Sequence, residues 1–231
     1  RTLFNKAIDV KEIDKSIYPF GKRKYQVPAT KKVKKAFSKQ QLSVLYHSTP
    51  QNQYQQKAKD FWFFSYACNG MNIKDICLLK YKDVRDGKIT FIRAKTKLTR
   101  KTNLAPITVF FNDHANGVID PYSTENKNPD NYVFPYLVGV VKPEEQRKKI
   151  QAFTRVINQH IKKLANENEL TAEISTYWAR KCFATQGIKN GNIMTFMQNV
   201  MGHQSPRTTQ DYFAGFEDET KKKFAEALMN F

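Results

Sequence analysis

A dense run of aromatic residues constrains the fold of this chain more than any other feature. Positions 61–64 are Phe, Trp, Phe and Phe, and Tyr66 follows after one residue. Such a run is typical of a buried core, because each aromatic side chain that leaves water removes a large apolar area. We therefore expect a helix from about Gln51 that carries this run into the core. A chain of 231 residues is long enough to bury such a core without disulfides or a structural metal.

Apolar residues recur at helical spacing along much of the remaining chain. The clearest stripe consists of Ile150, Phe153, Ile157, Ile161 and Leu164. It predicts a long helix that begins at Pro143, because proline favours the first helical position, and that ends near residues 166–168. Between residues 113 and 141 the signals weaken, since Asn and Pro interrupt each apolar run. The other predicted helices run from Ser38 to about His47, from Ser175 to Asn190, from Asn192 to Met201, from Pro206 to about Phe213 and from Asp218 to Phe231.

One segment carries a strand signal instead. The pair Asp86 and Gly87 is typical of a tight hairpin turn. Ile89 and Phe91 follow it, and they predict a small antiparallel sheet with the later apolar residues Leu104, Ile107 and Val109. We therefore predict a mainly α fold with a small antiparallel β-sheet, which places the chain in the α+β class.

The charge of the chain is strongly unbalanced. Lys and Arg number 39 against 21 acidic residues, which gives a net charge of +18. Such an excess repels itself in a folded chain and indicates a polyanionic partner, most often nucleic acid.

No apolar run approaches the ~18 residues of a membrane span, and no secretory signal opens the chain. Cys68, Cys77 and Cys182 have neither disulfide nor metal spacing, so we expect buried, reduced thiols in an intracellular protein. Secreted, membrane and fibrous classes are thereby excluded, and no metal or cofactor is expected.

Two basic segments are candidates for DNA contact. Residues 22–39 carry eight basic side chains and no acidic one, which fits either a solvated linker or a strand that follows a phosphate backbone. Residues 93–101 carry five basic side chains, which fit either a hairpin in a DNA groove or an edge that lysines keep soluble. We favour DNA contact for both segments. The candidate DNA-binding side chains are Lys24, Lys31, Lys32, Arg93, Lys97, Arg100, Lys101 and Arg207.

Two motifs in the last third of the chain are more specific. Residues 175–185 read STYWARKCFAT, and residues 201–212 read MGHQSPRTTQDY. These motifs resemble the two C-terminal boxes of the tyrosine recombinases, the phage integrase family. The resemblance gives Arg180 the place of the catalytic arginine, His203 that of the histidine and Tyr212 that of the nucleophile. It gives Lys95, in the basic segment, the place of the catalytic lysine.

These residue types suit the cleavage of a phosphodiester without a metal. A tyrosine that attacks the phosphate holds the DNA as a 3′-phosphotyrosine and conserves the bond energy for rejoining. The fork of Arg180 can grip two non-bridging oxygens. His203 can donate to another oxygen or help to deprotonate the attacking phenol of Tyr212. Lys95 is a candidate acid for the departing 5′-oxygen.

The first arginine of the family is missing. Residues 70–76 resemble the first box, but Asn72 stands at the arginine position, and an amide cannot replace the charge of a guanidinium. We interpret Asn72 as the N-cap of a short helix, opposite Asp75.

The second box departs from the family pattern at two positions. Tyr177 replaces the first histidine and can still donate one hydrogen bond through its hydroxyl group. Lys181 replaces the usual histidine after Arg180. Partial compensation for the missing arginine by Lys181 or Lys74 is a hypothesis.

The resemblance also implies a domain organisation. Residues 1–20 correspond to the end of an upstream core-binding domain, residues 21–37 to a basic linker, and residues 38–231 to a tyrosine recombinase catalytic domain. The last helix of that domain is expected to dock on a neighbouring protomer.

The implied function is that of a site-specific DNA recombinase, an integrase that integrates or excises a mobile element of the bacterial conjugative or mobilisable type. The implied partners are double-stranded DNA, further copies of the chain in a homotetramer on synapsed sites, and accessory DNA-bending proteins. The implied location is the bacterial cytoplasm, at the nucleoid. Two alternatives stay open: a catalytically impaired DNA-binding protein on the same scaffold, and a type IB topoisomerase.

Overall fold

The structure is a computed structural model of residues 1–231 that divides into two compact units, residues 1–33 and 34–231. It describes residues 1–27, 35–97, 106–171, 173–203, 205–213 and 216. Within the described residues, none of the helices has the length and apolar character that a membrane span requires.

The first unit is small and depends on aromatic contacts. It contains the helix α1, Thr2–Asp9, and the 3₁₀ turn η1, Lys15–Ile17. The ring of Phe20 lies at its centre, with ring centroids of Phe4 at 5.9 Å and Tyr25 at 6.0 Å. No residue of α1 is buried, so this unit has little core of its own.

The second unit is mostly helical. Its helices are α2 (Lys39–His47), α3 (Gln53–Ala67), α4 (Ile73–Cys77), α5 (Ala94–Lys97), α6 (Asp113–Tyr122), α7 (Pro143–Glu167), α8 (Thr176–Lys189), α9 (Met194–Val200) and α10 (Pro206–Gln210). Its 3₁₀ turns are η2 (Tyr81–Asp83) and η3 (Pro135–Leu137). The predicted fold class is confirmed, because the remaining regular structure of the described residues is a small antiparallel sheet.

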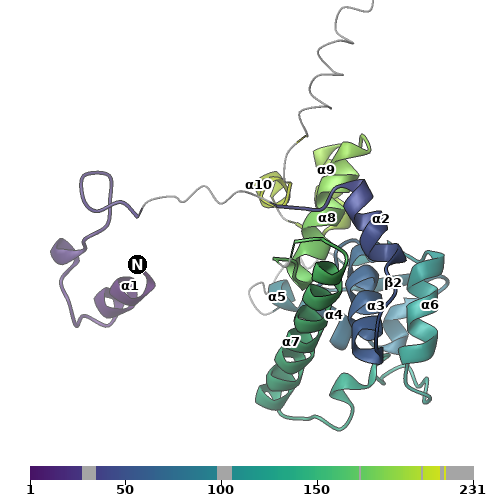
Figure 1. Cartoon of the computed structure of the whole chain (residues 1–231). Coiled ribbons are helices and arrows are strands. Elements are labelled where there is room, and N and C mark those ends of the chain that lie inside the picture. The colour runs from purple at the N-terminus through teal and green to yellow at the C-terminus, as the bar shows by residue number, and fades with distance from the viewer. Residues whose placement is uncertain (28–34, 98–105, 172, 204, 214–215, 217–231) are drawn as a thin grey trace, which may run out of the picture. The chain divides into compact units, whose positions relative to one another are not determined.

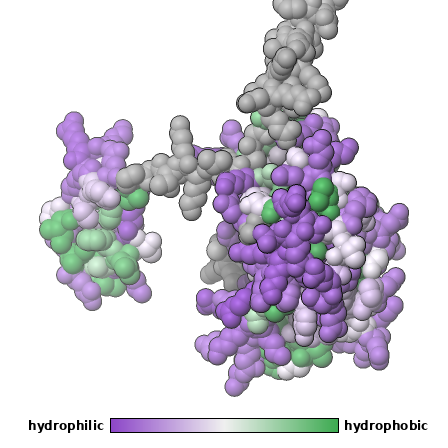
Figure 2. Space-filling model, viewed as in Figure 1, coloured by the Kyte–Doolittle hydropathy of each residue, from purple (hydrophilic) through white to green (hydrophobic). Residues whose placement is uncertain are grey.

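The aromatic run lies where the sequence predicted it, in the core. It belongs to α3, which packs against α6, α7 and α8 and runs beside α7 in Figure 1. Phe61, Trp62 and Phe64 are fully buried, because neighbouring helices cover α3 on several sides. The apolar stripe of α7 faces α3, whereas the outer face of α7 is hydrophilic in Figure 2.

Local sequence signals explain several helix ends. Ser38 and Gln41 form a capping box at the start of α2, and Asn52 accepts hydrogen bonds from two backbone amides of α3. The predicted helices at 38–47, 143–168 and 175–190 are confirmed within two residues. The predicted C-terminal helix from Asp218 to Phe231 lies outside the described residues.

The sequence missed α6. Asn112 caps this helix by accepting a hydrogen bond from the amide of Ala115 at 2.9 Å. The buried residues Ala115 and Val118 pack α6 against the core. Pro121 lies after them, near the C-terminal end of the helix. Pro121 was misleading because a proline within a predicted run normally ends a helix.

The sheet has the order β1 (Val84–Arg85), β2 (Lys88–Phe91) and β3 (Ile107–Phe110), and its pairs are antiparallel. Ile89 pairs with Val109, so two buried apolar residues meet on one face. The expectation of a basic hairpin that starts at Arg93 is wrong for residues 94–97, which form α5. The amide of Ala94 donates to Asp75 Oδ1 at 2.8 Å, and this contact with α4 supplies an N-terminal cap that no local sequence signal indicates.

The three cysteines agree with the sequence analysis. Cys68, Cys77 and Cys182 are free and buried. Burial raises the pKa of the Cys182 thiol to about 12, so the thiol stays protonated and unreactive near neutral pH.

Candidate active site

The residues of the C-terminal motifs meet in one cluster around the guanidinium of Arg180. Arg180 lies on α8 and is only 3% exposed. His203 follows α9, and Tyr212 follows α10, so the turns between these short helices bring both rings to the same side of α8. In the view of Figure 1, α8, α9 and α10 lie at the same end of the second unit.

Backbone carbonyls hold the guanidinium of Arg180. Nη1 donates to the carbonyl of Gly70 at 2.8 Å, and Nη2 donates to the carbonyl of Met201 at 2.7 Å. Burial, followed by the charge of Arg93, lowers the pKa of Arg180 to about 10. Arg180 therefore remains a cation near neutral pH, in a fixed orientation. Its Nε is buried and has no hydrogen-bond partner within the described residues.

Gly70 permits the close approach of its chain to Arg180. Its φ is +68°, and a Cβ at this position would lie 2.8 Å from the Cα and the Cγ of Arg180. The sequence analysis did not give this residue a role. Its position as the first residue of the first box was the available signal.

We expect a Gly70→Ala variant to lose stability and activity together. The left-handed backbone alone costs about 1–2 kcal/mol for an alanine, and the methyl group must also displace the Arg180 side chain. A displacement of about 1 Å at a catalytic group commonly slows a reaction about 10²-fold. Urea unfolding and single-turnover DNA cleavage would measure the two effects.

Gly139→Ala is the matched control for this substitution. Gly139 has a φ of +73° and no atom within 4 Å of its Cβ position, so it isolates the backbone strain. Equal cleavage rates in the two variants would contradict the positioning role of Gly70.

His203 is held in one neutral tautomer. Its Nε2 lies 2.6 Å from Arg180 Nη2, which can only donate, so Nε2 accepts. The proton is therefore on Nδ1, which donates to Thr209 Oγ1 at 2.9 Å. Burial is the main cause, and the charges of Arg180 and Arg93 add to it, so the pKa of His203 falls to about 3. Thr209 is fully buried and was not among the predicted site residues, although it lies within the second motif.

Acid should weaken the fold through His203. Because the folded-state pKa of about 3 lies below the ordinary value of 6.5, the unfolded chain binds more protons between these pH values. Stability should therefore fall as the pH drops below about 6.5, by up to about 1 kcal/mol per unit. Urea unfolding at pH 7, 6, 5 and 4 would show a shallower slope for His203→Gln. An unchanged slope would contradict the neutral, buried histidine.

The ring of Tyr212 packs against the other members of the cluster. Its centroid lies 5.0 Å from that of His203, with an angle of 27° between the rings, and 5.3 Å from Arg180 Cζ. The ring of Tyr177 lies 5.3 Å away. Burial, followed by a hydrogen bond with Tyr212, raises the pKa of Tyr177, so its hydroxyl group keeps its proton and can donate.

The two cationic candidates Lys95 and Arg93 differ in their exposure. Lys95 is exposed on α5, and its charge contributes to the lowered pKa of His203, so it lies near the cluster. Arg93 was expected among the exposed DNA contacts, but it is only 9% exposed. Arg93 is therefore buried beside the active-site cluster rather than displayed on an outer surface.

Asn72 occupies the predicted N-cap position of α4, but its side chain makes no capping hydrogen bond. Its Nδ2 donates instead to Asp75 Oδ2 at 3.4 Å. The ammonium group of Lys181 lies 5.3 Å from the centroid of the Tyr177 ring, and Lys74 is exposed on α4.

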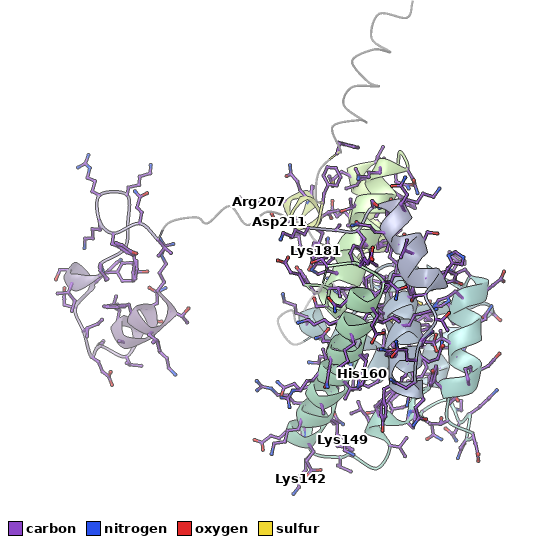
Figure 3. The ribbon with its side chains drawn as sticks, in the orientation of Figure 1. Lys142, Lys149, His160, Lys181, Arg207 and Asp211 are labelled. Carbon is purple, nitrogen blue, oxygen red and sulfur yellow. The ribbon has the colours of Figure 1, made fainter. Side chains whose placement is uncertain are left out.

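Three of the remaining candidate DNA contacts are described. Lys97 is exposed on α5, and Arg207 is exposed on α10, where Figure 3 labels it. Lys24 in the first unit donates to the carbonyls of Ser16 at 3.0 Å and Tyr18 at 2.6 Å, so its ammonium group holds its own loop. The other candidates, Lys31, Lys32, Arg100 and Lys101, lie outside the described residues. No group of three or more His, Cys, Asp or Glu side chains suited to a metal occurs in the part of the chain that the structure describes.

A buried arginine on α8, a histidine after α9 and a tyrosine after α10 agree with a comparison of the sequence with known families. The family described as the phage integrase family matches residues 31–219. The chain belongs to the phage integrase family. The tyrosine recombinase class recognised from the C-terminal motifs is thereby confirmed.

Solved structures of tyrosine recombinases have the same fold. The XerA recombinase is similar with a TM-score of 0.57 and 19% identity, over 83% of this chain and 64% of XerA. The integrase of transposon Tn1549, in complex with transposon right end DNA, is similar with a TM-score of 0.58 and 17% identity, over 97% of this chain and 75% of that chain. A lambda integrase dimer bound to a core site gives a TM-score of 0.53 at 14% identity, over 90% of this chain and 68% of that chain.

The chain is shorter than these integrases, and it spans less than two thirds of XerA. No curated protein sequence matches it significantly. The similar structures that contain DNA make double-stranded DNA the partner to test for this integrase-family chain.

Proposed function

We propose that this chain carries the catalytic domain of an integrase, which cleaves and rejoins duplex DNA at specific sites through a 3′-phosphotyrosine. The observation that carries the proposal is the packing of Tyr212 against His203 and Arg180. The ring-to-ring distance of 5.0 Å and the ring-to-guanidinium distance of 5.3 Å bring a nucleophile, a proton acceptor and a phosphate-binding cation together.

The Tyr212 oxygen attacks the scissile phosphorus and displaces the 5′-oxygen of the next nucleotide. One P–O bond forms as the other breaks, so the phosphotyrosine keeps the energy of the original ester. Attack by the 5′-hydroxyl of a partner strand reverses the step and releases Tyr212.

Arg180 and His203 act on the negative charge of this transition state. Arg180 is already oriented by two backbone carbonyls, so it does not need to reorganise during the reaction. A bound phosphate competes with His203 Nε2 for the guanidinium and raises the pKa of the histidine, because it offsets the nearby cations. His203 Nε2 then becomes an acceptor for the phenol proton of Tyr212.

The two remaining polar groups have separate tasks. Lys95 protonates the departing 5′-oxygen from α5. The Tyr177 hydroxyl donates a hydrogen bond to the nucleophile or to a phosphate oxygen, in the place of the family's histidine. Lys181 lies against the ring of Tyr177 and supports its position.

The mobile-element setting is supported by the similarity to the Tn1549 transposon integrase over 97% of this chain. The same proposal includes a homotetramer on two synapsed sites, joined through the segment 218–231, and accessory DNA-bending proteins in the bacterial nucleoid. In the proposed domain organisation, residues 1–20 are the end of a core-binding domain, residues 21–37 are a basic linker and residues 38–231 are the catalytic domain. The basic charge of +18 suits all these contacts with DNA.

A suicide-substrate selection tests the function even though the target sequence is unidentified. The chain is mixed with a pool of randomised duplexes, each nicked so that the cleaved fragment diffuses away and rejoining fails. Adducts that resist SDS are captured and sequenced. We expect one enriched sequence, joined to the protein through a 3′-phosphate.

The alternatives give different results. Specific DNA binding without an adduct would overturn the proposed enzymatic activity and favour a catalytically impaired DNA-binding protein. Adducts that relax supercoiled plasmids without any exchange of strands between two sites would favour a type IB topoisomerase.

A further inference from the structure

The active site contains a second buried arginine that the family pattern does not assign. Asn72 leaves the site without its first arginine; Lys74 is exposed, and the ammonium group of Lys181 lies over the ring of Tyr177, 5.3 Å from its centroid. Arg93 is different, because its side chain is 9% exposed and lies between elements that build the site.

Contacts on two sides fix the position of Arg93. A Cβ on Gly202 would lie 3.4 Å from Arg93 Cδ, so the Arg93 side chain passes directly beside the residue that precedes His203. On the backbone side, Asp75 links Asn72 to Ala94, the residue that follows Arg93. Its carboxylate accepts from Asn72 Nδ2 at 3.4 Å and from the amide of Ala94 at 2.8 Å.

The electrostatics show that the charge of Arg93 acts within the cluster. It lowers the pKa of both Arg180 and His203, in each case after the larger effect of burial. The charges of Arg180, Arg93 and Lys95 all act on the neutral His203, and the charge of Asp75 acts on Arg180. The buried guanidiniums of Arg93 and Arg180 oppose each other's charge, and an anionic ligand between them would relieve that repulsion.

We propose that Arg93, entering from the end of β2 beside Gly202, supplies the second guanidinium contact to the scissile phosphate that Asn72 cannot provide. The proposal rests on the recombinase function above. The family's arginine would come from the first box, whereas this one comes from the basic segment, next to the Asp75 carboxylate that also contacts residue 72. Arg93 is then a catalytic residue rather than a general DNA contact.

Single-turnover cleavage of a nicked duplex, at saturating protein, tests the role of Arg93. We expect Arg93→Gln to cleave about 10²–10³-fold more slowly than the wild type, because a charged contact to the transition state is lost. The DNA dissociation constant should change less than about threefold, since one phosphate contact is a small part of the binding. Arg93→Lys keeps the charge without the fork and should fall between the two.

Arg85→Gln is the matched control. Arg85 is exposed on β1 in the same sheet, so the variant makes the same change of charge away from the site. Its cleavage rate should equal that of the wild type. Thermal unfolding of each variant identifies a folding defect, and Arg93→Lys serves as the test if Arg93→Gln does not fold.

A neutral substrate separates a catalytic role from a structural one. In a methylphosphonate duplex, one charged oxygen of the scissile phosphate is replaced by a methyl group. If Arg93 neutralises that charge, the defect of the variant should shrink at least about tenfold on one of the two stereoisomers. A structural defect would be equally large on both substrates.

The outcomes distinguish this inference from the function on which it rests. If the wild type forms no adduct, the recombinase function falls. If the wild type cleaves and a folded Arg93 variant cleaves within about threefold of it, or shows the same defect on the neutral substrate, the role of Arg93 is overturned and the function stands.

Discussion

A Tyr212→Phe variant should form no covalent complex with DNA, while it binds the same duplex with the affinity of the wild type. The substitution removes the oxygen that attacks the phosphorus in the proposed mechanism, and the neighbouring Tyr177 is proposed only to donate a hydrogen bond. The aromatic ring remains, so its contacts with His203 at 5.0 Å and Tyr177 at 5.3 Å persist. Gel analysis of SDS-resistant adducts on a nicked duplex would measure the loss, which should exceed about 10⁴-fold.

Tyr177→Phe is the control for this experiment, because its hydroxyl group lies beside the nucleophile. We expect slower cleavage with normal adducts, since Tyr177 only donates a hydrogen bond. The loss of one hydrogen-bond donor to a transition state costs about 10²–10³-fold. If the adduct formed with Tyr212→Phe and was absent with Tyr177→Phe, Tyr177 would be the nucleophile and Tyr212 the hydrogen-bond donor.

An Arg180→Lys variant should lose cleavage by about 10³-fold, although the charge is conserved. A lysine offers a single point of charge, whereas the guanidinium donates to two carbonyls and still presents further N–H groups to the phosphate. The substitution also leaves the carbonyls of Gly70 and Met201 without their donors, so the melting temperature should fall. Single-turnover cleavage at saturating protein would separate the chemical step from binding.

Arg155→Lys makes the same substitution at an exposed position on α7 and should leave both rate and stability unchanged. A normal cleavage rate in Arg180→Lys would show that only the charge matters at this position. The fixed orientation of the guanidinium would then have no catalytic role.

Much of the fold followed from local patterns in the sequence. The aromatic run, the apolar stripe of α7 and the Ser38 capping box each predicted an element that the structure confirms, because hydrophobic period and capping are local properties. The exceptions were α5 and α6. Asp75 caps α5 from another element, and α6 keeps Pro121 near its end, so neither helix depended on its own sequence signals alone.

The candidate site was predictable only in part. The motifs around Arg180, His203 and Tyr212 were visible because their spacing is distinctive, and they indicated the nucleophile by position. Sequence spacing carried no information about which groups orient these side chains. The carbonyl of Gly70 is 110 residues away from Arg180 in the chain, and the hydrogen bond between them exists only after folding.

The sequence alone therefore determined the family and the helical core and predicted the nucleophile, since these depend on residue types at short spacing. Only the tertiary structure decided the protonation state of His203 and the place of Arg93. Both depend on burial and on charges from distant elements, which lower the pKa of the histidine and bring a second guanidinium beside Arg180. An isolated sequence contains the charges, but the distances between them, and hence their interaction energies, are set by packing.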